Sequence, residues 1–202
     1  MSRVAAIVLA AGTANRYRAA DPSIATKLVA LIDGVPMVRH IVEAALASRA
    51  RPVVVVTGYA EAEVRATLDG LTVGFVANPD YATGIASSLR AGLSALPTKV
   101  DGALVLLGDM PGVTAPLLDR LIEAHRADPD RDAVVPMHAG RRGNPVLLGR
   151  VLFGAAMELR GDEGARRLLV RAEVLEVDVT DRAVLVDVDD PATLASLGLQ
   201  SH

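Results

Sequence analysis

The stretch Val4-Ala-Ala-Ile-Val-Leu-Ala-Ala-Gly-Thr13 decides how the chain is expected to fold. The run from Val4 to Leu9 is wholly apolar, which is typical of a strand buried on both faces of a parallel sheet. It leads directly into Ala10-Ala11-Gly12, whose small side chains let backbone N–H groups approach a phosphate closely. We therefore expect the first strand to open into a phosphate-binding loop. A tight turn that contains a glycine is the alternative explanation of the same residues.

Apolar runs and helical patterns alternate along the rest of the chain. Further strands are expected at residues 52–57, 71–77, 103–107, 133–137, 146–148, 174–177 and 184–188. Helices are expected to begin at Pro36 and Pro191, and to cover residues 60–68, 85–96, 115–127 and 164–170. Strand–helix–strand units in series predict an α/β fold, a three-layer α/β/α sandwich with a mostly parallel sheet, formed by residues 1–202 as a single domain.

Ligands of such a sheet bind outside the carboxyl ends of its strands. The segments in question here are 9–12, 78–84, 108–111 and 187–190. Ser87 and Ser88 follow the second of these segments near the start of an expected helix, where hydroxyl and free N–H groups can meet an anion or a base edge. Serines are equally common there as plain helix caps, so both roles stay open.

Composition narrows the function classes. The chain has no cysteine, which excludes disulfides and thiolate metal sites. A net charge of −3 and an aromatic content of 2% argue against a nucleic-acid partner. No apolar stretch approaches the roughly 20 residues of a membrane span, and the N-terminus lacks a signal-peptide pattern, so we expect no membrane partner and a cytoplasmic protein. The ligand is expected to be small.

Neither of the commoner nucleotide-binding motifs is present. The chain contains no G-x-G-x-x-G and no G-x-x-x-x-G-K-[ST], so neither a dehydrogenase nor a P-loop protein is supported. Lysine is rare, because of the 21 basic residues all but Lys27 and Lys99 are arginines. Lys27 lies after the first loop, where a compact ammonium would suit a phosphate, and Arg16 could bind phosphate oxygens with its planar fork. Both could also be solvated loop cations.

Acidic residues follow two of the expected strands. Asp109 comes directly after the apolar run 103–107 and Gly108, which would hold its carboxylate at the sheet edge. Asp187 and Asp189 alternate along the last expected strand and so point to the same side. Carboxylate oxygens suit Mg²⁺, so we expect these three residues to bind it. Asp109 could instead cap the helix that follows it, and Asp189 or Asp190 is well placed to cap the helix that begins at Pro191.

The start of the chain also resembles the signature L-A-A-G-x-S-x-R-M-G-x-x-K of the MobA-like NTP-transferase family, typified by molybdenum-cofactor guanylyl- and cytidylyltransferases. Leu9 to Gly12, Arg16 and Lys27 match its fixed letters. Further stretches similar to the family extend nearly to the end of the chain, at residues 78–81, 84, 87–93, 107–111, 143–147, 160–166 and 187–191. The set most resembles the cytidylyltransferase branch of the family.

The resemblance implies a Rossmann-like nucleotide-diphospho-sugar transferase (GT-A-like) fold and a Mg²⁺-dependent nucleotidyltransferase. Such an enzyme would transfer CMP from CTP to molybdopterin, a pterin-type phosphate acceptor, and release pyrophosphate. Its product could pass to a molybdoenzyme. The implied catalytic residues are Arg16, Lys27 and Asp109. The residues implied to contact the nucleotide or the acceptor are Leu9, Ala10, Ala11, Gly12, Asn78, Ser87, Ser88, Gly108 and Asn144.

The loop after the first strand departs from the signature. Tyr17-Arg18 replaces Met-Gly, and the segment from Arg16 to Lys27 is several residues longer. We expect an exposed, lengthened loop that still delivers Lys27, but the loop could also accept a different triphosphate or none. A GTP- or other NTP-dependent transferase for another acceptor, including a sugar phosphate, and a non-catalytic nucleotide or cofactor carrier are therefore the alternatives. Pyrophosphate release would distinguish an enzyme from a carrier.

Overall fold

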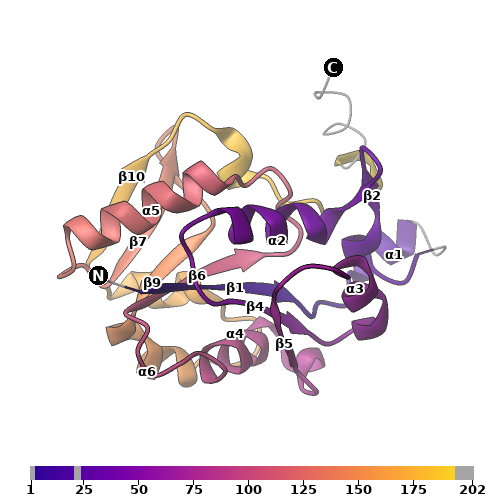
Figure 1. The fold of residues 1–202 in the computed structure, drawn as a ribbon, viewed down its shortest axis with the longest axis horizontal. Helices are drawn as coiled ribbons and strands as arrows, with labels where there is room; N and C mark the ends of the chain where they lie inside the picture. Colours follow the sequence, from indigo (N-terminus) through magenta and orange to yellow (C-terminus); the bar gives the residue numbers. More distant parts are fainter. Residues whose placement is uncertain (1–2, 21–23, 194–202) are drawn as a thin grey trace.

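A central sheet covered by helices on both faces forms the body of the molecule (Figure 1). The computed structural model describes residues 3–20 and 24–193, apart from the side chains of residues 15, 16 and 18. The strands of the sheet are β1 (Val4–Ala10), β4 (Val53–Thr57), β5 (Gly74–Ala77), β6 (Gly102–Leu107), β7 (Ala133–His138), β8 (Arg141–Arg142), β9 (Val146–Gly149) and β10 (Val174–Asp178). A separate antiparallel hairpin consists of β2 (Leu31–Ile32) and β3 (Val35–Pro36).

Strand pairing confirms the mostly parallel sheet. The strand order is β10-β7-β9-β6-β1-β4-β5, with β8 paired to β7. β1 lies inside the sheet and pairs in parallel with β4 and β6, whereas β9 runs antiparallel to its neighbours β6 and β7. The apolar run of β1 is buried along nearly its whole length, as expected for a central strand with helices on both faces.

Two apolar cores fill the space between the sheet and its helices, so the three-layer α/β/α sandwich is confirmed. Ala6 and Val8 of β1 belong to one core and Ile7 to the other, because successive side chains of a strand point to opposite faces. In Figure 1, α2 and α5 lie on one side of the sheet, and α4 and α6 on the other. The α-helices are α1 (Asn15–Ala20), α2 (Met37–Ala47), α3 (Glu61–Thr67), α4 (Ile85–Ser94), α5 (Ala115–Ala127) and α6 (Phe153–Met157).

Helix α5 shows how sequence pattern sets these boundaries. Thr114 precedes the helix with an extended backbone, and a proline occupies its first turn, where the missing N–H leaves no bond unmade. Leu117, Leu118, Leu121 and Ile122 recur at helical spacing, and all four are buried in the first core.

The expected last strand is wrong. Residues 184–188 form no strand, since Arg182–Leu185 is a 3-10 helix and residues 186–189 have no regular structure. Val184 and Val188 are both buried, but they belong to different clusters. Their spacing therefore reflects packing of an irregular segment and not pairing with another strand.

Other local expectations also need correction. The expected helix at residues 164–170 is a 3-10 helix over Ala165–Val170. The short helices α1 and α6 were not expected, because neither is long enough to show a periodic apolar face. Residues 191–193 are helical as expected, and the rest of the expected helix falls on residues outside the described ones. The other 3-10 helices are η1 (Lys27–Val29), η2 (Tyr81–Thr83) and η3 (Arg150–Leu152).

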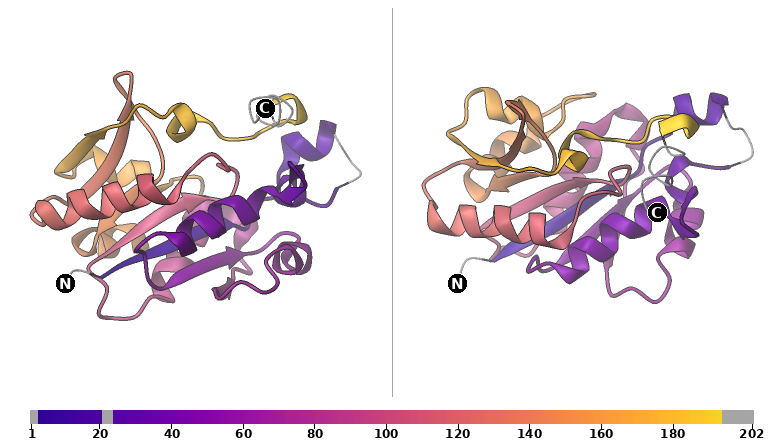
Figure 2. Two further views of the ribbon diagram at one scale, coloured as in Figure 1. Left: turned by 45° about the horizontal axis from the view of Figure 1, so that its top comes forward. Right: turned by 90° about the horizontal axis from the view of Figure 1, so that it is seen from above.

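A third, small cluster joins the two ends of the described chain. It contains Tyr17 of α1, Ile32 of the hairpin and Val188. Figure 2 shows the segment that carries Val188, in yellow, running beside α1. The expectation of an exposed loop after Arg16 is therefore wrong for Tyr17, which is only 2% exposed because its ring packs into this cluster.

No helix in the described part of the chain is both long and apolar enough to cross a membrane.

Candidate active site

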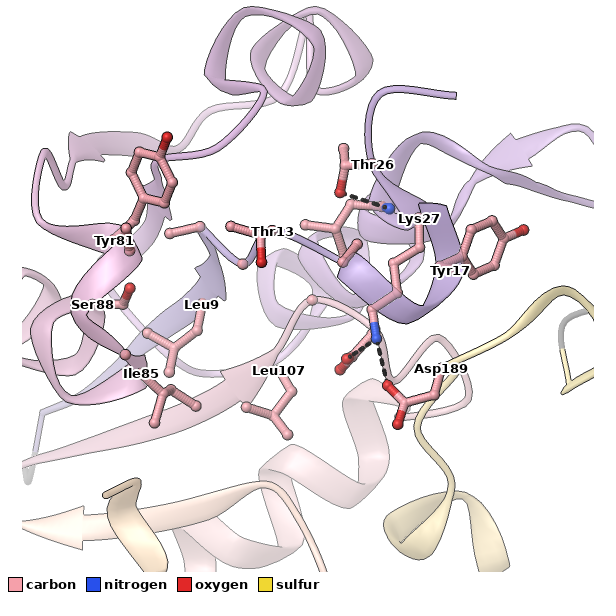
Figure 3. Close-up of a pocket in the computed structure, with 18 of the residues that line it drawn as sticks. Leu9, Thr13, Tyr17, Thr26, Lys27, Tyr81, Ile85, Ser88, Leu107 and Asp189 are labelled. Carbon is pink, nitrogen blue, oxygen red and sulfur yellow. Dashed lines mark hydrogen bonds and ion pairs between the residues drawn. The ribbon is translucent and has the colours of Figure 1, made fainter. Parts of the chain in front are cut away.

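A pocket of about 520 Å³ opens at the carboxyl ends of β1 and β6, the edge at which parallel sheets bind ligands. The loop after β1, the segment around Lys27, the start of α4 and the end of β6 form its walls, and Asp189 closes one end (Figure 3). The structure therefore has a cavity at the strand ends, where the sequence predicts the site.

The loop after β1 supplies part of the pocket wall. Leu9, Ala11 and Gly12 line the pocket, whereas Ala10 is completely buried in the core. Gly108, which also lines the pocket, donates its N–H to the carbonyl of Leu9 at 3.0 Å and so holds the residue after β6 against the end of β1. Among the described residues, no atom lies within 4 Å of the place where a Cβ of Gly12 would stand. The loop backbone at Gly12 is therefore open to a ligand.

Lys27 points across the pocket toward acidic residues. Thr26 is buried, and its hydroxyl accepts a hydrogen bond from the Leu28 N–H at the start of η1. The Nζ atom of Lys27 lies 2.7 Å from Asp109 Oδ2 and 2.9 Å from Asp189 Oδ1 (Figure 3). Burial lowers the pKa of Lys27, but attraction to Asp109 and hydrogen bonds to both carboxylates outweigh it and raise the pKa above its usual value. The ammonium is therefore charged at neutral pH.

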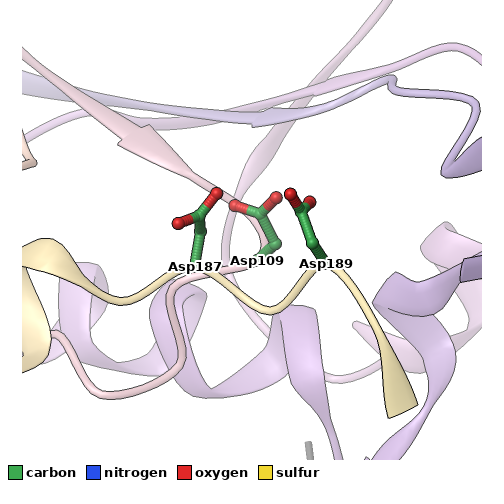
Figure 4. Close-up of side chains that lie close together, drawn as sticks. All are labelled: Asp109, Asp187 and Asp189. Carbon is green, nitrogen blue, oxygen red and sulfur yellow. The ribbon is translucent and has the colours of Figure 1, made fainter. Parts of the chain in front are cut away.

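Asp109, Asp187 and Asp189 form a compact acidic cluster. One oxygen from each carboxylate lies within 4.8 Å of the others. Figure 4 shows the three side chains next to one another, Asp109 from the loop after β6 and the other two from the last segment. The Val188 N–H donates to the Asp109 carbonyl at 2.9 Å and fixes the two segments to each other. The clustering expected from the sequence is thus present, although not on a strand.

The chemistry of this cluster fits a divalent cation. Oδ1 of Asp109 is buried, and no donor among the described residues forms a hydrogen bond with it. Buried polar atoms normally have a partner, so this oxygen has unused capacity to bind a ligand. Hard carboxylate oxygens are the ligands that Mg²⁺ and similar cations prefer.

Asp190 takes the capping role that the sequence left open. Its Oδ1 accepts a hydrogen bond from the Thr193 N–H at 2.7 Å. This backbone hydrogen bond lowers the pKa of Asp190. Asp190 therefore caps the helix that begins at Pro191, while Asp189 faces the pocket.

Asn78, Ser87 and Ser88 form a buried hydrogen-bonded group beside the pocket. The Asn78 amide donates to Ser87 Oγ at 2.8 Å and to Ser88 Oγ at 3.0 Å. The Ser87 hydroxyl also lies within hydrogen-bond distance of the carbonyls of Asp80 and Gly84, and Ser87 is not part of the pocket wall. Ser88 does line the pocket. The structure thus brings the three residues together and exposes Ser88 to a ligand.

A second pocket of about 340 Å³ adjoins the first. The two cavities share part of their walls, including Asp162. Asn144 and Asp187 line the second pocket, whereas Asp109 and Asp189 line the first. The acidic cluster therefore lies between two adjoining cavities, which is the arrangement expected when two substrates meet.

Several pocket residues had no role predicted from the sequence. Asp162 lies in a loop held against the start of α4, because the Ala86 N–H donates to the Gly161 carbonyl at 3.0 Å. Tyr17 and Tyr81 line the first pocket. Asp162 and Tyr81 lie in stretches that resemble the family, but nothing in their spacing pointed to a contact. The side chain of Arg16 lies outside the described part of the structure.

Comparison with known proteins agrees with this geometry. The family model of the MobA-like NTP transferase domain matches residues 6–177. The molybdenum cofactor cytidylyltransferase of Escherichia coli K12 is 28% identical over 142 residues, which cover 69% of this chain and 70% of that protein. The bifunctional protein GlmU of Aromatoleum aromaticum is 37% identical over 153 residues, which cover 74% of this chain but only 30% of GlmU.

Solved structures of similar fold extend over nearly the whole chain. Rv0371c of Mycobacterium tuberculosis H37Rv superposes with a TM-score of 0.82 and 28% sequence identity, covering 98% of both chains. A second structure of Rv0371c, in complex with manganese, has a TM-score of 0.77, an identity of 25% and full coverage of both chains. With its Rossmann-like GT-A type fold and a family match that spans most of its length, this chain belongs to the MobA-like NTP transferase family and is a nucleotidyltransferase.

Proposed function

We propose that this protein transfers CMP from CTP to the terminal phosphate of molybdopterin and releases pyrophosphate, with Mg²⁺ as its cofactor. The observation that supports this most directly is the meeting of the acidic cluster and Lys27 beside the loop after β1. A nucleoside triphosphate needs a metal ion, a further cation and backbone N–H donors around its phosphates. The E. coli relative is named as a cytidylyltransferase of molybdenum cofactor, which favours CTP and a pterin-type acceptor.

Asp109, Asp187 and Asp189 would hold the magnesium ion. The donor set consists of carboxylate oxygens, one of them buried and unsatisfied, and this suits a hard divalent cation. The manganese complex of Rv0371c also favours a divalent cation in a protein of this kind. When bound, the ion would supply charge stabilisation to the phosphate oxygens of the nucleotide.

The residues on the β1 side would bind and align the triphosphate. Of the amides expected at Ala10 to Gly12, the N–H groups of Ala11 and Gly12, which line the pocket, would donate to phosphate oxygens. Arg16 and Lys27 would offset phosphate charge. Gly108 keeps β6 close to this loop, since a Cβ on it would lie only 3.0 Å from the Leu9 carbonyl oxygen. The hydrogen-bonded group of Asn78, Ser87 and Ser88 would fix the opposite wall.

The acceptor would occupy the second pocket. One oxygen of its phosphate would form a bond to the α-phosphorus of CTP, while the bond from that phosphorus to the bridging oxygen of the β-phosphate breaks and pyrophosphate leaves. Because the acceptor supplies the nucleophile, the enzyme contributes alignment and charge stabilisation and needs no covalent intermediate. Asn144 and Asp162 would hydrogen-bond the acceptor, and the product could then pass to a molybdoenzyme.

Thermal shift with CTP, GTP, UTP and ATP, each with and without Mg²⁺, tests the nucleotide. A ligand that binds only the native state raises the free energy of unfolding by RT ln(1 + [L]/Kd), and the unfolding midpoint rises with it. We expect CTP to give the largest shift and the shift to require Mg²⁺. A larger shift with GTP would contradict the assignment of the base.

Pyrophosphate release by Asp109→Asn tests the chemistry. We expect turnover to be lost while the unfolding midpoint stays close to that of the wild type, because the change removes a charge from the pocket and not from the core. Asp130→Asn is a matched control, since Asp130 is exposed on the turn between α5 and β7, at the opposite edge of the sheet. Unchanged turnover of folded Asp109→Asn would remove this residue from the mechanism.

The higher identity to GlmU favours a second candidate, a nucleotidyltransferase for another triphosphate and another acceptor, including a sugar phosphate. Pyrophosphate release with a panel of acceptors distinguishes the two. Saturable nucleotide binding without any pyrophosphate release would instead favour a non-catalytic carrier.

A further inference from the structure

Lys27 contacts the same side chains that the proposed function assigns to a metal ion. Its Nζ atom lies between two members of the acidic cluster, 2.7 Å from Asp109 and 2.9 Å from Asp189. The lysine side chain is only 11% exposed, and the two carboxylates are 20% and 36% exposed. The contact joins residues 162 positions apart in the sequence and is therefore made by the fold, not by chain proximity.

We propose that in the nucleotide-free protein Lys27 forms ion pairs with the carboxylates of the metal site. When the triphosphate binds, the Lys27 ammonium contacts its phosphate oxygens instead, and the carboxylates become available to the metal ion. This inference rests on the proposed function, since it presupposes the metal site. Metal and nucleotide then bind as a coupled pair: either one alone binds weakly, and each strengthens the binding of the other by the same factor.

Charge explains the coupling. Three carboxylates with no cation nearby would repel one another, and Lys27 offsets part of that charge in the free protein. A divalent cation that enters the cluster alone must share Asp109 and Asp189 with an ammonium of like charge. The phosphates give Lys27 a new anionic partner close to the same place, because the loop after β1 and Lys27 line one pocket.

Mn²⁺ binding to the full chain, measured by electron paramagnetic resonance without nucleotide, tests the exchange. We expect Lys27→Met to lower the dissociation constant for Mn²⁺ about tenfold, the scale of two partly exposed ion pairs that no longer have to be broken. Lys99→Met is a matched control, because Lys99 is the only other lysine and is exposed. An unchanged Mn²⁺ affinity of folded Lys27→Met would overturn the proposal.

A second measurement uses the wild-type chain and needs no variant. Because the chain has two lysines, acetylation of each can be followed by mass spectrometry, with Lys99 as the internal reference. We expect saturating Mn²⁺ alone to speed acetylation of Lys27, and Mn²⁺ with a non-hydrolysable CTP analogue to slow it again. An acetylation rate of Lys27 that stays the same with and without saturating Mn²⁺ would contradict the exchange.

Asp109→Asn separates failure of this inference from failure of the proposed function. If Asp109→Asn loses Mn²⁺ binding but Lys27→Met binds Mn²⁺ no better than the wild type, the metal site is correct and the exchange is wrong. If Asp109→Asn binds Mn²⁺ normally, the metal site itself is wrong and the exchange falls with it.

Discussion

Replacing Gly84 by alanine should disturb the contact that holds the Asp162 loop against α4. Gly84 precedes α4 with φ 110° and ψ 170°, a backbone conformation that is essentially restricted to glycine. A Cβ at this position would lie 2.2 Å from the carbonyl carbon and oxygen of Gly161. The same carbonyl accepts the Ala86 N–H at 3.0 Å. Alanine would therefore strain the backbone and push the Asp162 loop away from both pockets.

The size of the effect follows from these contacts. The unfavourable backbone conformation costs about 1–3 kcal/mol, and the overlap of the new Cβ with Gly161 costs about 1–3 kcal/mol. Movement of the loop would relieve the overlap but lose a hydrogen bond worth about 1 kcal/mol. Because these effects compensate one another in part, we expect Gly84→Ala to lower the free energy of unfolding by roughly 3–4 kcal/mol.

Urea unfolding and CTP affinity measure the two consequences. We expect a lower urea midpoint and weaker CTP binding, since Asp162 and Gly84 both line the first pocket. Gly154→Ala is the matched control, because Gly154 lies in α6 with no described atom within 4 Å of its Cβ position. It should gain up to about 1 kcal/mol from helix propensity. A Gly84→Ala protein within about 1 kcal/mol of the wild type would refute the predicted contact.

Three further predictions address the proposed phosphate-binding lysine, the third cluster and a buried histidine. Lys27→Ala should lose about 2–4 kcal/mol of transition-state stabilisation, seen as a fall in kcat/KM of about a hundredfold or more, and Lys27→Arg should recover only part of it. Values of kcat/KM within about twofold of wild type for both would reject this role. Tyr17→Ala should lose about 3 kcal/mol of stability and weaken Mn²⁺ binding, whereas Leu68→Ala in the first core should lose similar stability with Mn²⁺ affinity unchanged. Burial lowers the pKa of His125, so the folded state resists protonation and stability should fall as the pH drops from about 6.5 toward the lowered value. His125→Gln should flatten that fall in urea midpoints measured across this range, and an equally steep fall would exclude His125 as its source.

The parts of the fold that the sequence predicted are those with a complete local signal. β1 is apolar throughout, and α5 repeats its apolar residues at helical spacing with a proline in the first turn. Both were predicted to within a residue of their ends. Residues 184–188 show the limit of this reasoning, because Val184 and Val188 satisfy a strand pattern while packing into separate clusters. An alternating apolar pattern indicates that the apolar side chains are buried. Pairing in a sheet is one way to bury them, and packing of an irregular segment is another.

The candidate site was predicted only in part, because only some of its contacts have a signal in the sequence. The clustering of Asp109 with Asp187 and Asp189 could be anticipated, because all three follow apolar segments expected at one edge of the sheet. The sequence placed Asp187 and Asp189 on a strand, whereas an irregular segment carries them in the structure. The hydrogen bond from the Val188 N–H to the Asp109 carbonyl holds that segment in place. The partners of Lys27 could not be anticipated at all. Its charge suggested phosphate, and only the fold shows that carboxylates lie within 3 Å of it.

Tyr17 shows how a departure from a motif can be structural. The segment from Arg16 to Lys27 is longer than the family signature, and from the sequence alone the extra length suggested an exposed loop. The structure instead buries Tyr17 against the cluster that contains Val188, the residue between two members of the acidic cluster. Tyr17 thereby links the loop after β1 to the segment that carries Asp187 and Asp189. The segment from Arg16 to Lys27 thus contacts the acidic segment twice, through Tyr17 near its start and through Lys27 at its end. Both contacts require length, so the departure in length is compatible with a working site.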